Sequence, residues 1–322
     1  MRFLSILSVI AILSACGYSN PQHQIDSAIA ARFTLIHAAP VISLDWKNGT
    51  GYIAAAQLGY GDLYIVDILT NTQDKVMSAL GAIDELSWCG NSLLGGSQQL
   101  WVWNLDSSQS NILIDEWSDY YYYAPIAWNA GCTIVATVHR TMAAVSLPVQ
   151  ILNLTSLSQY LVDVGDRSPT AIAWKPNSNL LAIGFDHTNE VAIYNIDESR
   201  VSKTLSGSVN FPLLALEWSS NGNYLAIAYQ NKISIWDSIN WQNLRDINLP
   251  TGNLYQIRWH PNDKYIASVS ESGTSIWNVL NGTQTVAQDS PAYSLDWSTN
   301  GDQIAIGGVG TIQVLDVVSW PN

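Results

Sequence analysis

Asp45, Glu217, Arg258 and Asp296 are charged residues that each directly precede a tryptophan in an aliphatic–x–Trp motif. If the fold gathers them, the guanidinium would pair with the carboxylates and offset part of their charge. Carboxylate oxygens also suit Ca²⁺ or Mg²⁺, and Asp45 and Asp296 are the pair that would hold such an ion. Two carboxylates are too few for a dedicated cage. We therefore expect an ion-pair cluster and keep a cation site as the alternative.

Other catalytic patterns are missing from the sequence. Neither a GxSxG elbow nor an HExxH helix occurs, and no Cys/His set has zinc spacing. His187 follows Asp186, but a single His–Asp pair in a loop is typical of a solvated turn. The pairs Gly95-Gly96 and Gly307-Gly308 fall in apolar strand segments rather than in phosphate-binding loops. We assign no catalytic residue, no cofactor and no metal ligand.

A tryptophan recurs along the chain every 38 to 46 residues. An aliphatic residue stands two positions before it, and a polar turn follows, often rich in Asn and Gly, which tolerate the positive φ of tight turns. The seven tryptophans are Trp46, Trp88, Trp128, Trp174, Trp218, Trp259 and Trp297. Repeats of this length, if each holds four short strands, are typical of propeller blades.

Each repeat continues with an apolar strand such as 52–57, an alternating strand, and a more polar strand such as 243–249. The alternating strand ends in Asp or Asn, as in Trp236-Asp237 and Trp277-Asn278. This pattern resembles the WD-repeat β-propeller family over residues 31–322, although the family's Gly-His dipeptide is absent from every unit. The resemblance implies an all-β, seven-bladed β-propeller in one domain, with strands a to d in each blade.

The two ends of the chain are expected to meet. After Trp297 there are 25 residues, enough for strands b and c but not for d. Residues 32–37 precede the first repeat and look like a strand. We predict that this N-terminal strand completes the last blade as its strand d, which closes the ring and removes open sheet edges.

The resemblance also places the candidate residues. Strand a lies nearest the central channel, so Asp45, Glu217, Arg258 and Asp296 would form a channel charge cluster. Cys89 and Cys132 would lie in a–b turns of adjacent blades, on the same face. An oxidising compartment would permit a disulfide between them, but diverging blades could hold their Cα atoms beyond the bridging limit of about 7 Å. The disulfide therefore stays a possibility.

In the WD-repeat family the d–a and b–c loops share one face, which we call the top face. Two of the longest connections, 117–125 and 139–148, fall there in one blade. Tyrosine offers apolar area with a polar tip and suits interfaces. The predicted partner-binding residues are Tyr60, Tyr120, Tyr121, Tyr122, Tyr123, Arg140, His187, Phe211 and Tyr293. The alternative is that the tyrosines pack between blades.

The first residues are typical of a signal peptide. Arg2 is followed by an apolar stretch too short to span a bilayer, and then by Leu13-Ser14-Ala15-Cys16. This resembles the bacterial lipobox, in which residues 1–15 are removed and Cys16 is lipidated, leaving 16–30 as a tether. The resemblance implies a lipoprotein of the cell envelope, in the outer membrane or on the outer face of the cell membrane. An ordinary secretory signal with a chance cysteine is the alternative.

Composition narrows the function further. The chain has 322 residues and a formal charge of −13, and an acidic protein repels nucleic-acid phosphates. We expect a non-enzymatic, lipid-anchored propeller that binds a protein partner through its top face and serves as a scaffold. The alternatives are a metal-dependent propeller hydrolase or lactonase with carboxylates at the channel, and a glycan-binding propeller.

Overall fold

The computed structural model describes residues 29–79, 81–114, 121–141, 146–186, 188, 190–207, 212–250 and 252–317. Within these ranges, the side chains of 29, 121–124, 139–141, 146–147 and 286–287 are not described. The described residues form strands and turns without a helix, so none of them provides a helix that could cross a membrane.

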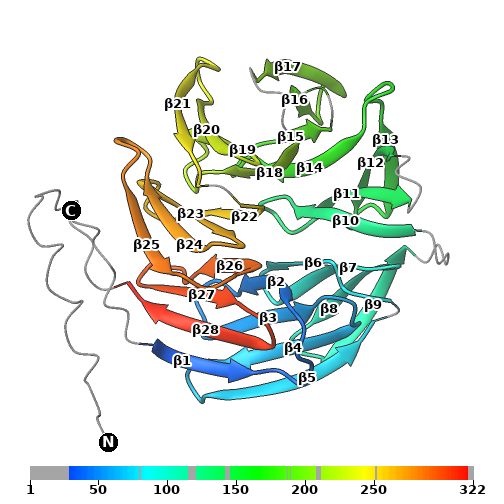
Figure 1. The fold of residues 1–322 in the computed structure, drawn as a ribbon. Coiled ribbons are helices and arrows are strands. Elements are labelled where there is room, and N and C mark those ends of the chain that lie inside the picture. The colour runs from blue at the N-terminus through cyan, green and yellow to red at the C-terminus, as the bar shows by residue number, and fades with distance from the viewer. Residues whose placement is uncertain are drawn as a thin grey trace, which may run out of the picture.

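Seven four-stranded antiparallel sheets surround a central axis, and the first strand of each lies innermost (Figure 1). Blades 1 to 3 are formed by β2 (Val41–Trp46), β3 (Tyr52–Gln57), β4 (Asp62–Asp67), β5 (Thr72–Ser78); β6 (Glu85–Cys89), β7 (Ser92–Gly96), β8 (Leu100–Asn104), β9 (Gln109–Ile114); β10 (Tyr121–Trp128), β11 (Ile134–Thr141), β12 (Ser146–Asn153), β13 (Ser158–Val162).

Blades 4 to 7 are formed by β14 (Pro169–Trp174), β15 (Leu180–Phe185), β16 (Glu190–Asn195), β17 (Arg200–Ser206); β18 (Leu213–Trp218), β19 (Tyr224–Tyr229), β20 (Lys232–Asp237), β21 (Asn243–Asn248); β22 (Leu254–Trp259), β23 (Tyr265–Ser270), β24 (Gly273–Asn278), β25 (Gln284–Gln288); β26 (Ser294–Trp297), β27 (Gln303–Gly307), β28 (Thr311–Asp316) and β1 (Ile29–Thr34). The fold is therefore the predicted all-β, seven-bladed propeller.

The N-terminal strand closes the ring. β1 pairs antiparallel with β28, with Phe33 opposite Ile312 and Thr34 opposite Thr311. The strand begins three residues earlier than the predicted 32–37, and it ends at Thr34 because the chain turns there into the loop that leads to β2. The tether expected at 16–30 therefore overlaps the start of this strand by two residues, Ile29 and Ala30.

Hydrophobic burial explains why each blade needs its neighbours. The second strand of each blade is buried on both faces, as in β3 and β19, because blades stack on either side of it. The outermost strands are polar and exposed, as in β5. The cores lie between adjacent blades; one joins Phe33 of blade 7 to Trp46 of blade 1. A single sheet could not bury these surfaces alone.

The Asp or Asn at the end of each third strand has a local function in the six blades whose c–d turns are described. Its side-chain oxygen accepts the backbone N–H two residues later and thereby holds the turn. The pairs are Asp67–Leu69, Asn104–Asp106, Asn153–Thr155, Asn195–Asp197, Asp237–Ile239 and Asn278–Leu280, at 2.7 to 3.1 Å. Both side chains carry the required oxygen, so Asn replaces Asp in this turn.

Candidate functional site

The repeating tryptophans fasten each blade to the one before it. In five of the seven, the indole Nε1–H donates to the backbone carbonyl of the residue that precedes the previous blade's tryptophan. The pairs are Trp128–Ser87, Trp174–Ala127, Trp218–Ala173, Trp259–Glu217 and Trp297–Arg258, at 3.0 to 3.3 Å. Trp46 donates to Thr50 in its own turn instead, and Nε1 of Trp88 is buried without a partner. Five of the seven repeat tryptophans therefore link adjacent blades of the ring.

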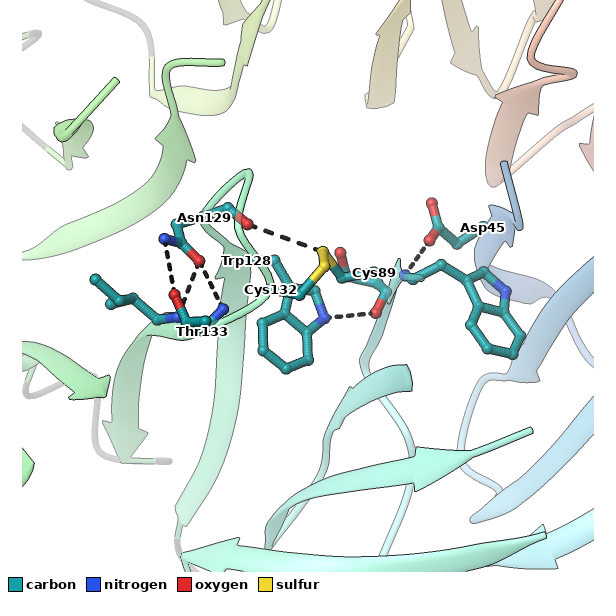
Figure 2. Close-up of a disulfide and its surroundings, with 9 residues drawn as sticks. Asp45, Cys89, Trp128, Asn129, Cys132 and Thr133 are labelled. Carbon is teal, nitrogen blue, oxygen red and sulfur yellow. Dashed lines mark hydrogen bonds between the residues drawn. A yellow bond between two sulfur atoms is a disulfide. The ribbon is translucent and has the colours of Figure 1, made fainter. Parts of the chain in front are cut away.

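Side chains of the innermost strands add a second link between blades. Strand a of each blade faces strand a of the next, and its exposed backbone N–H groups need acceptors. Asp296 accepts the N–H of Trp46 at 2.7 Å, Glu217 that of Trp259 at 2.9 Å, and Asp45 that of Trp88 (Figure 2). The channel acids are therefore structural acceptors that bridge blades.

The channel acids also form one electrostatic cluster with Arg258. Nε of Arg258 lies 3.7 Å from Oδ1 of Asp296. Burial and the charge of Asp296 raise the pKa of Asp45 well above its usual value, and the two carboxyl groups share a hydrogen bond. Two carboxylates this close cannot both ionise in a low-dielectric site. Burial also raises the pKa of Asp296, but the charge of Arg258 and the backbone N–H groups of Trp46 and Trp297 offset part of that rise. The pair therefore shares one proton, which Asp45 is better placed to hold, and its remaining negative charge faces Arg258.

Glu217 is the third acid of the cluster. Burial raises its pKa to about 8, and the charge of Arg258 offsets only part of that effect. Asp45, Asp296 and Glu217 each accept a backbone N–H, and burial raises the pKa of all three, which weakens them as ligands for a cation. Among the described residues, no group of three His, Cys, Asp or Glu is arranged to hold a metal. The arrangement favours the ion-pair cluster over the cation site.

Cys89 and Cys132 form a disulfide between blades 2 and 3, with their Cα atoms 5.5 Å apart (Figure 2). Blades do diverge outward, but Cys89 directly follows Trp88 on an innermost strand, where neighbouring blades are closest. The a–b turn of Cys132 is held by Oδ1 of Asn129, which accepts the backbone N–H of Thr133 at 2.9 Å. The bond joins turns on the face opposite the top, which we call the bottom face.

Other links between blades also occupy the bottom face. The carboxylate of Asp263 in blade 6 accepts the backbone N–H groups of Ser220 and Asn221 in blade 5, at 2.7 and 3.1 Å. His260 meets the carbonyl of Gly301 in blade 7 at 3.1 Å. The polar groups of these turns thus bind within the ring, and His260, whose ring packs edge-on against Tyr265 and Trp297, has a structural role.

On the top face, Tyr60 lies beside residues that the sequence did not single out. Its ring stacks on His37 with centroids 3.6 Å apart. His37 in turn reaches Asp62 at 3.4 Å, and Lys75 lies 3.5 Å from the same carboxylate. Partial burial acts to raise the pKa of Asp62, but hydrogen bonds from Ser78 and His37 and the charge of Lys75 lower it. Tyr60 is therefore held in place by a charged network.

Exposed apolar side chains occupy the loops at this stack, Tyr60 among them. Ile36, Leu58, Tyr60 and Val309 are 69, 53, 40 and 51% exposed. They come from three loops of blades 7 and 1, which are tied together by backbone hydrogen bonds from Leu58 to Pro40 and from Gly310 to Ala39. We call these four residues the apolar patch.

Tyr293, the other predicted top-face residue with a described side chain, lies between blades 6 and 7. Its ring packs against Tyr255 with centroids 5.2 Å apart. Tyr255 also approaches Glu271, with its hydroxyl 3.3 Å from Oε1. Tyr293 also lines a cavity of about 280 Å³. Its side chain therefore contacts both the ring of Tyr255 and this cavity.

The expectation of long loops at 117–125 and 139–148 is wrong where the structure has strands, at 121–125, 139–141 and 146–148. Tyr121, Tyr122 and Tyr123 belong to β10 and pair with Thr141, Arg140 and His139 of β11. Both strands are eight residues long, and their pairing extends beyond that of the first two strands in the other blades. The register places Tyr122 opposite Arg140 in the backbone pairing of blade 3. Cys16, Tyr120, His187 and Phe211 lie outside the described residues.

Sequence reasoning missed several residues of the site. Glu85 accepts the N–H of Ile126 at 2.9 Å and Gln256 that of Leu295 at 2.8 Å, three residues before a tryptophan rather than one. The two-residue period of a strand places both positions on the same side, so the alternation could have revealed them. His37 and the apolar patch had no such signal.

The comparisons with known proteins agree with this fold. A model described as the anaphase-promoting complex subunit 4 WD40 domain matches residues 172–262, which span blades 4 and 5 and the first strand of blade 6. A chain in a structure titled "Crystal Structure of Mitotic Checkpoint Complex" is similar at a TM-score of 0.77 and 15% identity, with 99% of each chain covered. No curated protein matches the sequence. The chain is thus a seven-bladed β-propeller, part of which matches a WD40 domain model.

Proposed function

We infer that this protein is a non-enzymatic scaffold: a propeller anchored by a lipid at Cys16 outside the cytoplasm, which binds a protein partner through its top face. The observation that carries the proposal is the apolar patch. Exposed apolar residues scattered singly need no explanation, but several that lie on hydrogen-bonded neighbouring loops of one face are typical of interaction sites.

The patch is also preorganised. The buried side chain of Gln57 donates from Nε2 to the carbonyls of His37 and Ala39, at 2.5 and 3.1 Å. A surface that is already ordered loses little entropy when a partner binds. The backbone bridge between Pro40 and Val309 has the same effect on the neighbouring loop.

Topology supports the orientation that this proposal requires. The start of β1, at Ile29, pairs with Leu315 near the end of β28, which is the bottom side of blade 7. The segment that leads back to Cys16 therefore joins the ring at the bottom. A lipid attached to Cys16 would hold the bottom face toward the membrane and leave the apolar patch facing away from it.

The disulfide supports an extracytoplasmic location. Disulfides persist in oxidising compartments and are rare in the cytosol. A lipobox at the N-terminus and an inter-blade disulfide are independent features that favour the same side of the membrane.

Site-specific photo-crosslinking in the native cell tests the binding face. Leu58 on the top and Leu280 on the bottom are both exposed leucines, at 53 and 75%, and so form a matched pair of positions for a photoreactive residue. We expect a discrete crosslinked product from position 58, lost when Val309→Glu is added, and none from position 280. Equal products from both positions, or none from position 58, would refute the proposal.

Fractionation tests the anchor separately. Cys16→Ser should leave the protein unlipidated and outside the membrane fraction. If the variant stays with the membrane after a high-salt wash, the lipid anchor is wrong, whatever the crosslinking shows.

A further inference from the structure

The cavity beside Tyr293 opens between blades 6 and 7 on the top face. Its walls come from the β25–β26 loop, the β27–β28 loop and the outer half of blade 7. At about 280 Å³ it is slightly smaller than the usual range for small-molecule sites, roughly 300–1,000 Å³. It has room for a single side chain of a partner and its adjoining backbone.

One wall of this cavity is built from polar side chains without internal partners. Arg32 stands opposite Gln313 in the β1–β28 pairing, and Thr311 is two residues from Gln313, so all three lie on the same side of blade 7. Phe33, the next residue after Arg32, points the other way into the core with blade 1. No hydrogen bond or ion pair joins any of the three side chains to another described residue.

A fourth polar group lines the cavity from blade 6. The side-chain Oε1 of Gln288 is buried and has no hydrogen-bond partner, while its Nε2 donates to Ser290. Buried polar atoms without partners are uncommon in folded proteins. The cavity therefore presents a cation and several hydrogen-bonding groups that no other residue in the described part of the chain satisfies, and that a ligand could engage.

The chemistry of this wall selects a carboxylate. A guanidinium offers parallel N–H donors that match the two oxygens of a carboxylate, and among the described residues that line the cavity Arg32 alone is charged. The chain has 26 acidic and 13 basic residues, so its net charge repels an acidic group, whereas Arg32 offers a local positive charge. An acidic side chain is thus favoured at this position, which helps to set the register of a partner.

We propose that this cavity receives the carboxylate of an Asp or Glu side chain from the protein partner, with an adjacent aliphatic side chain on Val309. Val309 belongs to both the cavity wall and the apolar patch, and so a single extended segment can reach both. The proposal rests on the function inferred above and names the chemistry of the partner at its site.

Peptide titration tests this assignment without knowledge of the partner. The probes are the blocked peptide acetyl-Ala-Leu-Asp-Leu-Ala-amide, the same peptide with Asn in place of Asp, and sodium acetate. Each is titrated to millimolar concentrations against the full propeller domain while the Arg32 Nε–Hε resonance is followed by NMR. We expect saturable shifts with the Asp peptide, binding roughly ten-fold weaker with the Asn peptide, and no saturation with acetate.

Two variants locate the effect. Arg32→Gln should remove the preference for Asp over Asn, as judged from the shifts of neighbouring backbone amides. Arg200→Gln removes the same charge from an exposed outer strand of blade 4 and should leave the preference intact. Thermal unfolding of both variants shows whether the fold is retained.

Several results would overturn the proposal. These are the absence of saturable binding by the Asp peptide, equal binding of the Asp and Asn peptides, a preference that survives Arg32→Gln, and acetate binding as tight as that of the peptide. In the last case the cavity is a site for small carboxylates. None of these results affects the crosslinking from position 58, so failure of the cavity and failure of the top-face partner are distinguishable.

Discussion

Oδ2 of Asp296 accepts the backbone N–H of Trp46 at 2.7 Å, although the two residues are 250 positions apart in the chain. The bond links blade 7 to blade 1, the junction that the N-terminal strand also closes. Asp296 also shares a hydrogen bond with the carboxyl group of Asp45 and forms an ion pair with Arg258. One carboxylate thus connects ring closure to the charge balance of the channel.

The two aspartates should respond differently to amidation. Asp45→Asn keeps an acceptor for Trp88 and supplies an N–H to Asp296 in place of the shared proton, so we expect a change in unfolding free energy within about 1 kcal/mol. Asp296→Asn leaves Arg258 without its closest charge partner and should cost about 3 kcal/mol. Urea unfolding at neutral pH measures both. Equal losses would mean that the proton is not held by Asp45.

Stability should fall as pH rises through the titration of Glu217. Its folded pKa of about 8 lies above the usual 4.5, so the folded state binds more protons than the unfolded state between these values. The contribution is complete below pH 4.5 and is lost as pH rises through 8, with a total on the order of a few kcal/mol. Unfolding free energies measured from pH 5 to 9 should show this decline.

Glu217→Gln tests whether Glu217 causes this decline in stability with pH, and Glu198→Gln serves as its control. Glutamine at position 217 still accepts the N–H of Trp259 but cannot ionise, so the slope between pH 5 and 8 should become shallower. Glu198 is exposed and pairs with Arg200, and its substitution should leave the slope unchanged. A slope that is the same in Glu217→Gln as in the parent protein contradicts the assignment.

The indole links should contribute measurably to the ring. Trp218→Phe removes the donor to the carbonyl of Ala173 and leaves that carbonyl without its partner, so we expect a loss of about 1–3 kcal/mol. Trp88→Phe removes an Nε1 that has no partner and should cost less. Chemical denaturation of the two variants makes the comparison, and a larger loss at Trp88 would mean that ring volume, rather than the link, decides the effect.

The disulfide should stabilise the junction of blades 2 and 3. Cys89 and Cys132 are 43 residues apart, for which the loop-entropy model gives about 4 kcal/mol. Reduction of the folded protein should lower its unfolding free energy toward that of the Cys89→Ser/Cys132→Ser variant. The variant itself serves as the control, because reductant should not change it. An unaltered unfolding curve for the parent protein after complete reduction would contradict this prediction.

The blades and their order could be predicted from sequence because their signals are local. A tryptophan spacing near one blade length, an apolar second strand and an Asp or Asn at the end of the third recur within each repeat. The closing strand was predicted three residues too late. Its register depends on hydrogen bonds to β28, about 280 residues away, and not on the pattern of 32–37 itself.

The site depended on contacts that no repeat contains. The sequence by itself determined that Asp45, Glu217, Arg258 and Asp296 occupy equivalent strand positions. The tertiary structure decided that Asp45 keeps a proton, that Cys89 lies within bonding distance of Cys132, and that Ile36, Leu58 and Val309 form one patch with Tyr60. Contacts between blades set these distances and the burial of each charge, and Asp296 reaches Trp46 only because the last blade closes on the first.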